Sequence, residues 1–218
     1  IELNMEIVEM KSNVNKSLFG FVKNNKNYSL ISYGSVRPKS SSEMKCEKLP
    51  CLPKSISFDL KGEYCVFMNG EGTIVYLFNL IANQLKSVVL TKQNLSFHQK
   101  ITCVEIHPHG QCLALGTQSG RIALWYSFLN KEIQMSYLHW HSLSVNCLSF
   151  SFDGSYLLSG GNECVLVKWI LNKNEPTFLP RLGSPLIYLT SSQDQTFYVS
   201  THVDNCKFLS SSFVIVFK

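Results

Sequence analysis

The sequence predicts an all-β fold made of repeated four-stranded units, and three observations lead to this prediction. Short runs rich in β-branched and aromatic residues recur along the 218-residue chain, separated by Gly, Asn and Asp clusters typical of tight turns. The turn glycines of three similar segments, Gly62, Gly110 and Gly154, are 48 and 44 residues apart. Helical periodicity is nowhere sustained. A repeat of this length, containing four short strands, is the signature of a β-propeller blade.

The clearest copy of the repeat extends from Leu148 to Trp169. Its first run alternates apolar residues with serines as far as Phe152, as expected for a strand with one buried face. Asp153 and Gly154 then supply a tight turn, since glycine adopts positive φ without steric cost. Two further apolar runs follow, and the last one ends at Trp169. This pattern predicts three meandering antiparallel strands.

The other copies share the spacing of this segment. Fifteen residues after the turn glycine, each copy has a large apolar residue: Leu77, Trp125 and Trp169. A second break lies ten residues after the turn glycine, at Gly72 and Gly120, and Cys164 occupies that position in the third copy. A weaker fourth copy spans 189–205, with its turn at Asp194. One blade cannot bury both of its faces alone, so the copies are expected to stack around an axis.

Four segments follow from this repeat. We predict a degenerate blade over 1–36, a polar loop rich in Ser, Lys and Pro over 37–54, three clear blades plus a partial one over 55–205, and a divergent end over 206–218. Closed propellers have at least about four blades and typically more. The sequence therefore predicts an incomplete arc of about four to five four-stranded blades that belongs to a longer protein.

Composition favours a packed core in a reducing compartment. Hydrophobic residues make up 45% of the chain and charged residues 16%, which argues against global disorder. The eight cysteines form no Cys-x-x-Cys pair, and most lie in apolar runs, where they are expected to act as small hydrophobic residues. No secretory signal pattern or bilayer-spanning run is present in the sequence given.

The net charge of +5 arises in the first half of the chain. Its basic residues are scattered and have no interleaved aromatic residues, which favours a solvated basic face over a nucleic-acid surface. Direct RNA binding through this half stays open as an alternative. The residues concerned are Lys11, Lys16, Lys23, Lys26, Arg37, Lys39, Lys45 and Lys48.

A search for catalytic motifs finds none. The pairs His107/His109 and His139/His141 could each present two metal ligands on one strand face, but zinc would require Cys or carboxylate partners at short spacing. No nucleophile elbow and no phosphate-binding glycine loop is present. We therefore expect no catalytic residues, no bound metal and no cofactor. The alternative is a metal-dependent propeller enzyme that uses His139 and His141 at the axial channel.

Several motifs resemble those of the WD-repeat family. His107-Pro-His-Gly110 is similar to the His-Pro-Asp-Gly turn of that family, and Gly120-Arg-Ile-Ala-Leu-Trp125 to its Gly-x-Ile-x-Leu-Trp strand end. The resemblance implies a structural network of His, Ser or Thr, Asp and Trp within each blade. The best match has Glu163 in place of Asp. The residues to which the resemblance assigns structural roles are His107, Gly110, Gly120, Trp125, His141, Asp153, Gly154, Ser159, Glu163 and Trp169.

Two further strings, Leu138-His-Trp-His141 and Phe178-Leu-Pro-Arg-Leu-Gly183, are similar to a nucleolar branch of the family. That branch consists of tandem-propeller subunits of the UtpA (t-UTP) subcomplex of the small-subunit processome. The similarity implies a non-catalytic scaffold in the nucleolus, with processome proteins and pre-ribosomal RNA as partners. It also implies a role in pre-rRNA processing and in positive regulation of RNA polymerase I transcription. The alternative is a generic WD-repeat interaction module of another complex.

Two residues are candidates for contact with a partner. Trp140 lies between two histidines at a blade boundary, where an exposed aromatic side chain is expected. Arg181 lies between Pro180 and Leu182, and its guanidinium could form a bidentate contact with carboxylate or phosphate. A local salt bridge of Arg181 is an equally open interpretation.

Overall fold

The structure is a computed structural model, and every regular element in the part that it describes is a β-strand. It describes residues 6–12, 18–24, 27–33, 45–82, 84–89, 100–110, 112–126, 128–129, 134–173, 175–204, 206–210 and 214–217. The strands form four-stranded antiparallel sheets, each made of four strands that are consecutive in the chain. The predicted all-β fold of four-stranded propeller blades is confirmed.

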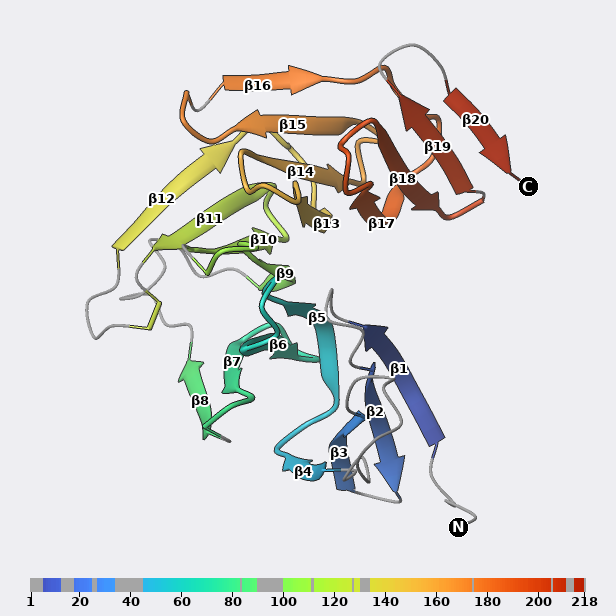
Figure 1. Ribbon diagram of the computed structural model, residues 1–218. Helices are drawn as coiled ribbons and strands as arrows, with labels where there is room; N and C mark the ends of the chain where they lie inside the picture. Colours follow the sequence, from blue (N-terminus) through green and yellow to red (C-terminus); the bar gives the residue numbers. More distant parts are fainter. Residues whose placement is uncertain are drawn as a thin grey trace.

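Each sheet is one blade, and five blades follow one another along the described chain (Figure 1). The first blade comprises β1 (Glu6–Ser12), β2 (Leu18–Asn24), β3 (Asn27–Tyr33) and β4 (Lys45–Leu49). The second comprises β5 (Pro53–Phe58), β6 (Tyr64–Asn69), β7 (Ile74–Asn79) and β8 (Gln84–Val89). The third comprises β9 (Ile101–Ile106), β10 (Cys112–Thr117), β11 (Arg121–Tyr126) and β12 (Gln134–His139). The fourth comprises β13 (Val145–Phe150), β14 (Tyr156–Gly161), β15 (Leu166–Ile170) and β16 (Glu175–Phe178). The fifth comprises β17 (Leu186–Ser191), β18 (Phe197–His202), β19 (Cys206–Ser210) and β20 (Val214–Phe217).

The blades are arranged as an open arc (Figure 1). From the second blade to the fifth, the first strands of neighbouring blades pack against each other: β5 against β9, β9 against β13, and β13 against β17. These strands line the inner side of the arc, and the later strands of each blade lie progressively farther out (Figure 1). The sheets do not close into a ring, as the repeat count predicted.

Side chains at irregularities in the strand pairing join neighbouring inner strands. Ser55, beside a pairing shift in β5, donates its hydroxyl to the carbonyl of Val104 at 3.2 Å and accepts the N–H of Val104 at 2.8 Å. The hydroxyl of Thr102 in the third blade donates to the carbonyl of Val145 in the fourth blade. Asn146 donates its amide to the carbonyl of Leu186 in the fifth blade at 3.0 Å. The extra residue of each bulge thus links one blade to the next.

The turn between the first two strands has one geometry in the second, third and fourth blades. Its glycine donates its N–H to the carbonyl three residues earlier and adopts a left-handed φ of 68° to 75°; the glycines are Gly62, Gly110 and Gly154. This φ costs other residues about 1–2 kcal/mol, which explains why glycine recurs there. In the fifth blade Gln195 takes the same place, with φ 61° and a 3.0 Å bond to Ser192.

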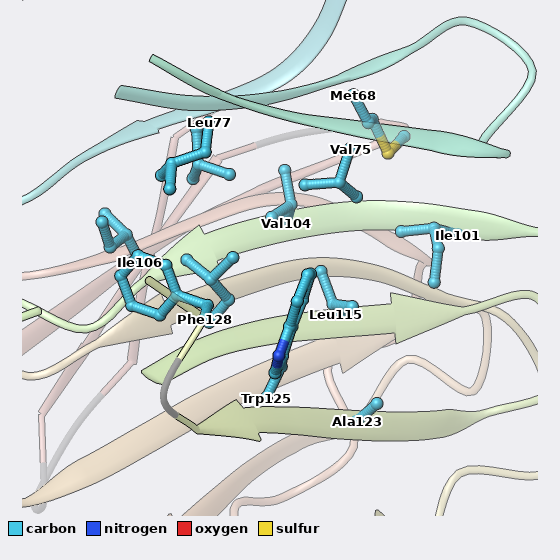
Figure 2. Packing of buried hydrophobic residues seen from close by; sticks show 12 residues of the cluster. Met68, Val75, Leu77, Ile101, Val104, Ile106, Leu115, Ala123, Trp125 and Phe128 are labelled. Atoms are coloured by element: carbon cyan, nitrogen blue, oxygen red, sulfur yellow. The ribbon is translucent and has the colours of Figure 1, made fainter. Parts of the chain in front are cut away.

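The hydrophobic core lies between neighbouring blades. Met68 and Leu77 of the second blade face Val104, Leu115 and Trp125 of the third (Figure 2). These side chains are at most 7% exposed. Because the cluster draws on two blades, neither blade can bury its apolar side chains without the other.

Strand β10 shows how one blade contributes to two cores. Leu113 and Leu115 pack toward the second blade, whereas Cys112 and Ala114 belong to a cluster with residues of the fourth blade. All six residues of β10 are buried. Successive side chains of a strand point to opposite faces, so a strand whose two faces both meet a neighbouring blade favours apolar residues at successive positions. This preference explains the continuous apolar run of this strand.

Two of the segments defined from the sequence contain strands. The expected polar loop over 37–54 contains β4 and the first residues of β5, and its residues 37–44 lie outside the described part. Strand β4 is the outermost strand of its blade and pairs only with β3, so it requires backbone hydrogen bonds rather than an apolar pattern. The end expected to diverge, 206–218, supplies β19 and β20, which give the fifth blade four strands.

Candidate functional site

The fourth blade brings together four residues that the sequence analysis grouped. His141 precedes β13, Ser159 lies on β14, Glu163 lies in the turn after β14, and Trp169 lies on β15. The Nε2 atom of His141 lies 2.8 Å from Ser159 Oγ, and its Nδ1 atom lies 3.3 Å from a Glu163 carboxylate oxygen. The indole N–H of Trp169 donates to the same Ser159 oxygen at 2.8 Å. Glu163 therefore takes the acceptor role expected of Asp.

Each proton in this network has one consistent position. The Glu163 carboxylate can only accept, so Nδ1 of His141 carries the proton and Nε2 accepts the hydroxyl of Ser159. The Ser159 oxygen then accepts from Trp169. Burial lowers the pKa of His141, and the nearby Glu163 carboxylate opposes that shift. The network therefore holds a neutral imidazole, with every polar group satisfied.

The serine, histidine and glutamate of this network are bonded in the order of a hydrolase triad. Ser159 and His141, however, have no exposed surface. A substrate carbonyl must come within about 3 Å of the serine oxygen, and here that oxygen is enclosed and already accepts the Trp169 N–H. The geometry is that of a structural clamp, which joins the segment before β13 to the second and third strands of the blade.

Asp153 organises the turn between β13 and β14. Its carboxylate accepts the N–H of Ser155 at 3.0 Å, the hydroxyl of Ser155 at 2.9 Å and the hydroxyl of Ser151 at 2.7 Å. These bonds lower the pKa of Asp153 well below its usual range, and the Ser155 N–H contributes most to this shift. Gly154 completes the turn. Asp153 is therefore a turn cap, as its position in the sequence predicts.

His107 connects the third blade to the fourth. Its Nδ1 atom accepts the backbone N–H of His109 at 3.2 Å, so its Nε2–H donates to the carbonyl of Gly154, also at 3.2 Å. Its ring also meets Phe150 edge-on, with centroids 5.1 Å apart. Burial lowers the pKa of His107. Both ring nitrogens are occupied, so this histidine is not available as a metal ligand in this conformation.

The third blade lacks the full network. Gly110 and Gly120 lie at its two turns, and Trp125 is 3% exposed in the core between blades. Leu115 occupies the position on β10 that Ser159 occupies on β14. The indole N–H of Trp125 therefore has no acceptor among the described residues. This blade relies on apolar packing where the fourth blade uses hydrogen bonds.

The fifth blade contains a polar pair that the sequence analysis missed. Ser200 occupies on β18 the position of Ser159 on β14, and its Oγ lies 2.8 Å from Nε2 of His202, two residues later on the same strand. The Nδ1–H of His202 donates to the carbonyl of Ser184 at 2.8 Å. The imidazole thus comes from the strand itself rather than from the preceding connection. The signal in the sequence is Ser-x-His, whose outer residues share one strand face.

Trp140 and Arg181, the two candidate contact residues, lie on the surface around the clamp. Trp140 is 40% exposed, and its ring makes a tilted contact with the ring of Phe178, which is 47% exposed, with centroids 4.6 Å apart. Arg181 is exposed and donates its Nε–H to the backbone carbonyl of Glu163 at 3.3 Å. Phe178 begins one of the strings that resemble the family, but its contact with Trp140 was not predicted from the sequence.

Within the described ranges, no three His, Cys, Asp or Glu side chains form a group that could hold a metal ion. A cavity of about 390 Å³ lies on the inner strands and is lined by residues such as Lys54, Glu105, Cys147 and Tyr188. Neither His139 nor His141 lines this cavity: His139 lies on β12, the outermost strand of the third blade, and His141 is bonded within the clamp. The described residues also include no helix that is long and apolar enough to cross a membrane.

The cysteines with described side chains are free thiols: Cys51, Cys65, Cys103, Cys112, Cys147, Cys164 and Cys206. Cys103 and Cys147 are buried on the inner strands, and burial raises the pKa of Cys103 to about 12. Thiols of this kind are unreactive and pack as small apolar side chains.

Comparison with known proteins gives a consistent result. Residues 5–205 match the family model of the WD repeat-containing protein 75 first beta-propeller. WD repeat-containing protein 75 of Mus musculus is 37% identical over 156 residues, 70% of this chain and 19% of the relative. That of Danio rerio is 34% identical over 203 residues, 88% of this chain and 24% of the relative. U3 small nucleolar RNA-associated protein 17 of Schizosaccharomyces pombe is 37% identical over 107 residues, 49% of this chain and 13% of the relative.

The chain thus spans about a quarter or less of the length of these relatives. The model match covers all but the ends of the chain, and the matched range includes the clamp, both candidate contact residues and all of the first four blades. The chain therefore belongs to the WD repeat-containing protein 75 first beta-propeller family.

Proposed function

We propose that this propeller is part of a non-catalytic scaffold in ribosome biogenesis. In this proposal the full protein acts in the nucleolus, in assembly of the small-subunit processome and in pre-rRNA processing. Other processome proteins of the UtpA type are its direct partners, and pre-ribosomal RNA associates with it within the complex. The protein also promotes transcription by RNA polymerase I.

Family membership over residues 5–205 is the observation that carries this proposal. The name of the Schizosaccharomyces pombe relative connects that protein to the U3 small nucleolar RNA. The arrangement of polar residues supports a scaffold, because the fully buried clamp of His141, Ser159 and Trp169 uses its hydrogen bonds within the blade. The surface is then left to make contacts with other molecules.

Purification of the tagged full-length protein tests the scaffold role. We expect U3 small nucleolar RNA and pre-rRNA to co-purify with it, and its protein partners to remain bound after RNase treatment. A tagged unrelated β-propeller is the matched control. Recovery of neither RNA above the control, or a location outside the nucleolus, would refute the proposal.

Depletion of the full-length protein tests the two activities separately. Unprocessed precursors of the small-subunit rRNA should accumulate, and pulse-labelled nascent pre-rRNA should decrease. Normal nascent synthesis with defective processing would remove the transcriptional role alone. Normal processing would remove the processome role, and the chain would then be an interaction module of another complex.

A further inference from the structure

We propose that Trp140, Leu143, Phe178 and Arg181 form a docking surface for a short peptide segment of a partner protein, in which an apolar side chain lies next to a carboxylate. We call these four residues the Trp140–Arg181 surface. The inference rests on the scaffold function proposed above and specifies the chemistry of one partner.

The apolar side chains of this surface are exposed, and two of them are in contact. Trp140, in the connection between β12 and β13, packs against Phe178 at the end of β16 in a tilted ring contact, with ring centroids 4.6 Å apart and an interplanar angle of 41°. After this contact the two side chains remain 40% and 47% exposed. Leu143, in the same connection as Trp140, is 51% exposed. Large exposed apolar residues that lie together, rather than singly, are typical of interaction sites.

Glu163 holds both sides of the surface in place. Its carboxylate accepts the backbone N–H of Leu143 and the Nδ1–H of His141, the residue after Trp140. Its backbone carbonyl accepts the Nε–H of Arg181 at 3.3 Å. One residue of the clamp therefore fixes the connection that carries Trp140 and the segment that carries Arg181. A surface fixed in this way loses little conformational entropy when a ligand binds.

The charge of Arg181 is available to a ligand. In the described part of the chain it forms no ion pair, and its bond to Glu163 uses one of five guanidinium N–H groups and a neutral carbonyl. The Glu163 side chain is only 10% exposed, and its oxygens already accept bonds from the 141–143 segment. The guanidinium can therefore give a bidentate bond to an incoming carboxylate.

A peptide fits this surface better than RNA does. RNA binding depends on neutralising several phosphates, and this surface contains one arginine beside three apolar side chains. Trp and Arg are instead the residues that contribute most to protein–protein binding energy. The complementary ligand is a segment with one carboxylate beside an apolar residue.

Binding of a selected peptide tests the charge requirement. Short random peptides displayed on phage are selected on the full-length protein, and the best peptide is synthesised with a fluorophore for anisotropy titration. Arg181→Glu should weaken its binding about tenfold or more. Arg181→Lys should weaken it less, because the charge remains without the planar fork. The matched control, Lys173→Glu, reverses an exposed charge of the same blade outside the surface and should leave the dissociation constant unchanged.

A second pair of variants tests the apolar requirement. Phe178→Ser should weaken peptide binding about fivefold or more. Ile81→Ser removes an apolar residue that is 74% exposed in the second blade and should have no effect. Circular dichroism melting of each variant verifies the fold. A peptide in which the carboxylate is replaced by lysine should bind Arg181→Glu better than it binds the wild type.

The outcomes separate this inference from the proposed function. Selected peptides that lack carboxylates, or equal affinities for Arg181→Glu and Lys173→Glu, would overturn the peptide surface. A second outcome would also overturn it. If Arg181→Glu no longer binds single-stranded oligouridine but still binds the peptide, the surface binds RNA. Co-purification of U3 small nucleolar RNA with the wild type reports on the proposed function alone. The peptide surface can therefore be refuted while the proposed function holds, and the reverse is also true.

Discussion

Replacement of Ser159 by alanine should destabilise the protein by about 2–6 kcal/mol. The Ser159 oxygen holds two buried partners at 2.8 Å, the indole N–H of Trp169 and Nε2 of His141. Alanine leaves both without a partner in a region closed to water, and each such group costs about 1–3 kcal/mol. The change in volume is small, so loss of hydrogen bonding dominates the cost. Urea unfolding followed by circular dichroism measures it.

A double-mutant cycle attributes the loss to the network. With Trp169→Phe in the background, Ser159→Ala leaves only His141 without a partner, so its cost should fall by about 1–2 kcal/mol. Ser142→Ala is the matched control, because Ser142 is exposed and its hydroxyl lies 3.5 Å from Glu163. The control should change the free energy of unfolding by less than about 0.5 kcal/mol. A cost of Ser159→Ala below about 1 kcal/mol, or an equal cost in both backgrounds, would refute the reasoning.

Three further predictions concern other parts of the arc. Trp125→Phe removes a buried N–H that has no acceptor among the described residues, so urea unfolding should show a loss below about 1 kcal/mol; a loss above about 3 kcal/mol would reveal a hidden partner. Gly120→Ala should cost at least about 2 kcal/mol more than Gly110→Ala, because both have positive φ but only the first places its Cβ against the His141 carbonyl; equal urea midpoints would contradict this. Burial lowers the pKa of His107 and of His141, so the unfolded chain binds more protons below about pH 6.5 and stability should fall there as the pH decreases. Thermal melting between about pH 7.5 and pH 5.5 tests this, and a midpoint that rises on acidification would be the wrong sign.

The sequence predicts most accurately those features that depend on neighbouring residues. The turn at Asp153 and Gly154 depends on residues within a few positions, and the spacing from it to Trp169 fixes three strands. Outer strands such as β4 and β20 were not predicted, because they pair on one side only and need no apolar pattern. His202 was missed for a related reason. Its role depends on register, since it shares a strand face with Ser200 and reaches the Ser184 carbonyl of the preceding connection.

Contacts between blades show the same limit. The sequence indicated that His107 lies at a turn, but not that its ring bonds to the carbonyl of Gly154 in the next blade. It singled out Trp140 and Arg181 separately. Only the fold places Phe178 against Trp140, and only the fold makes Glu163 the residue that anchors both segments.

The sequence by itself determined the order of strands and turns in each repeated unit, because turn chemistry and side-chain alternation act over a few residues. The tertiary structure decided which polar groups find partners and which aromatic side chains remain on the surface. Those outcomes depend on how blades stack, and stacking brings together residues separated by tens of positions. Trp125 and Trp169 are the clearest example. They hold similar sequence positions, yet the indole N–H of Trp125 has no acceptor in the described part of the chain, whereas that of Trp169 belongs to a complete network.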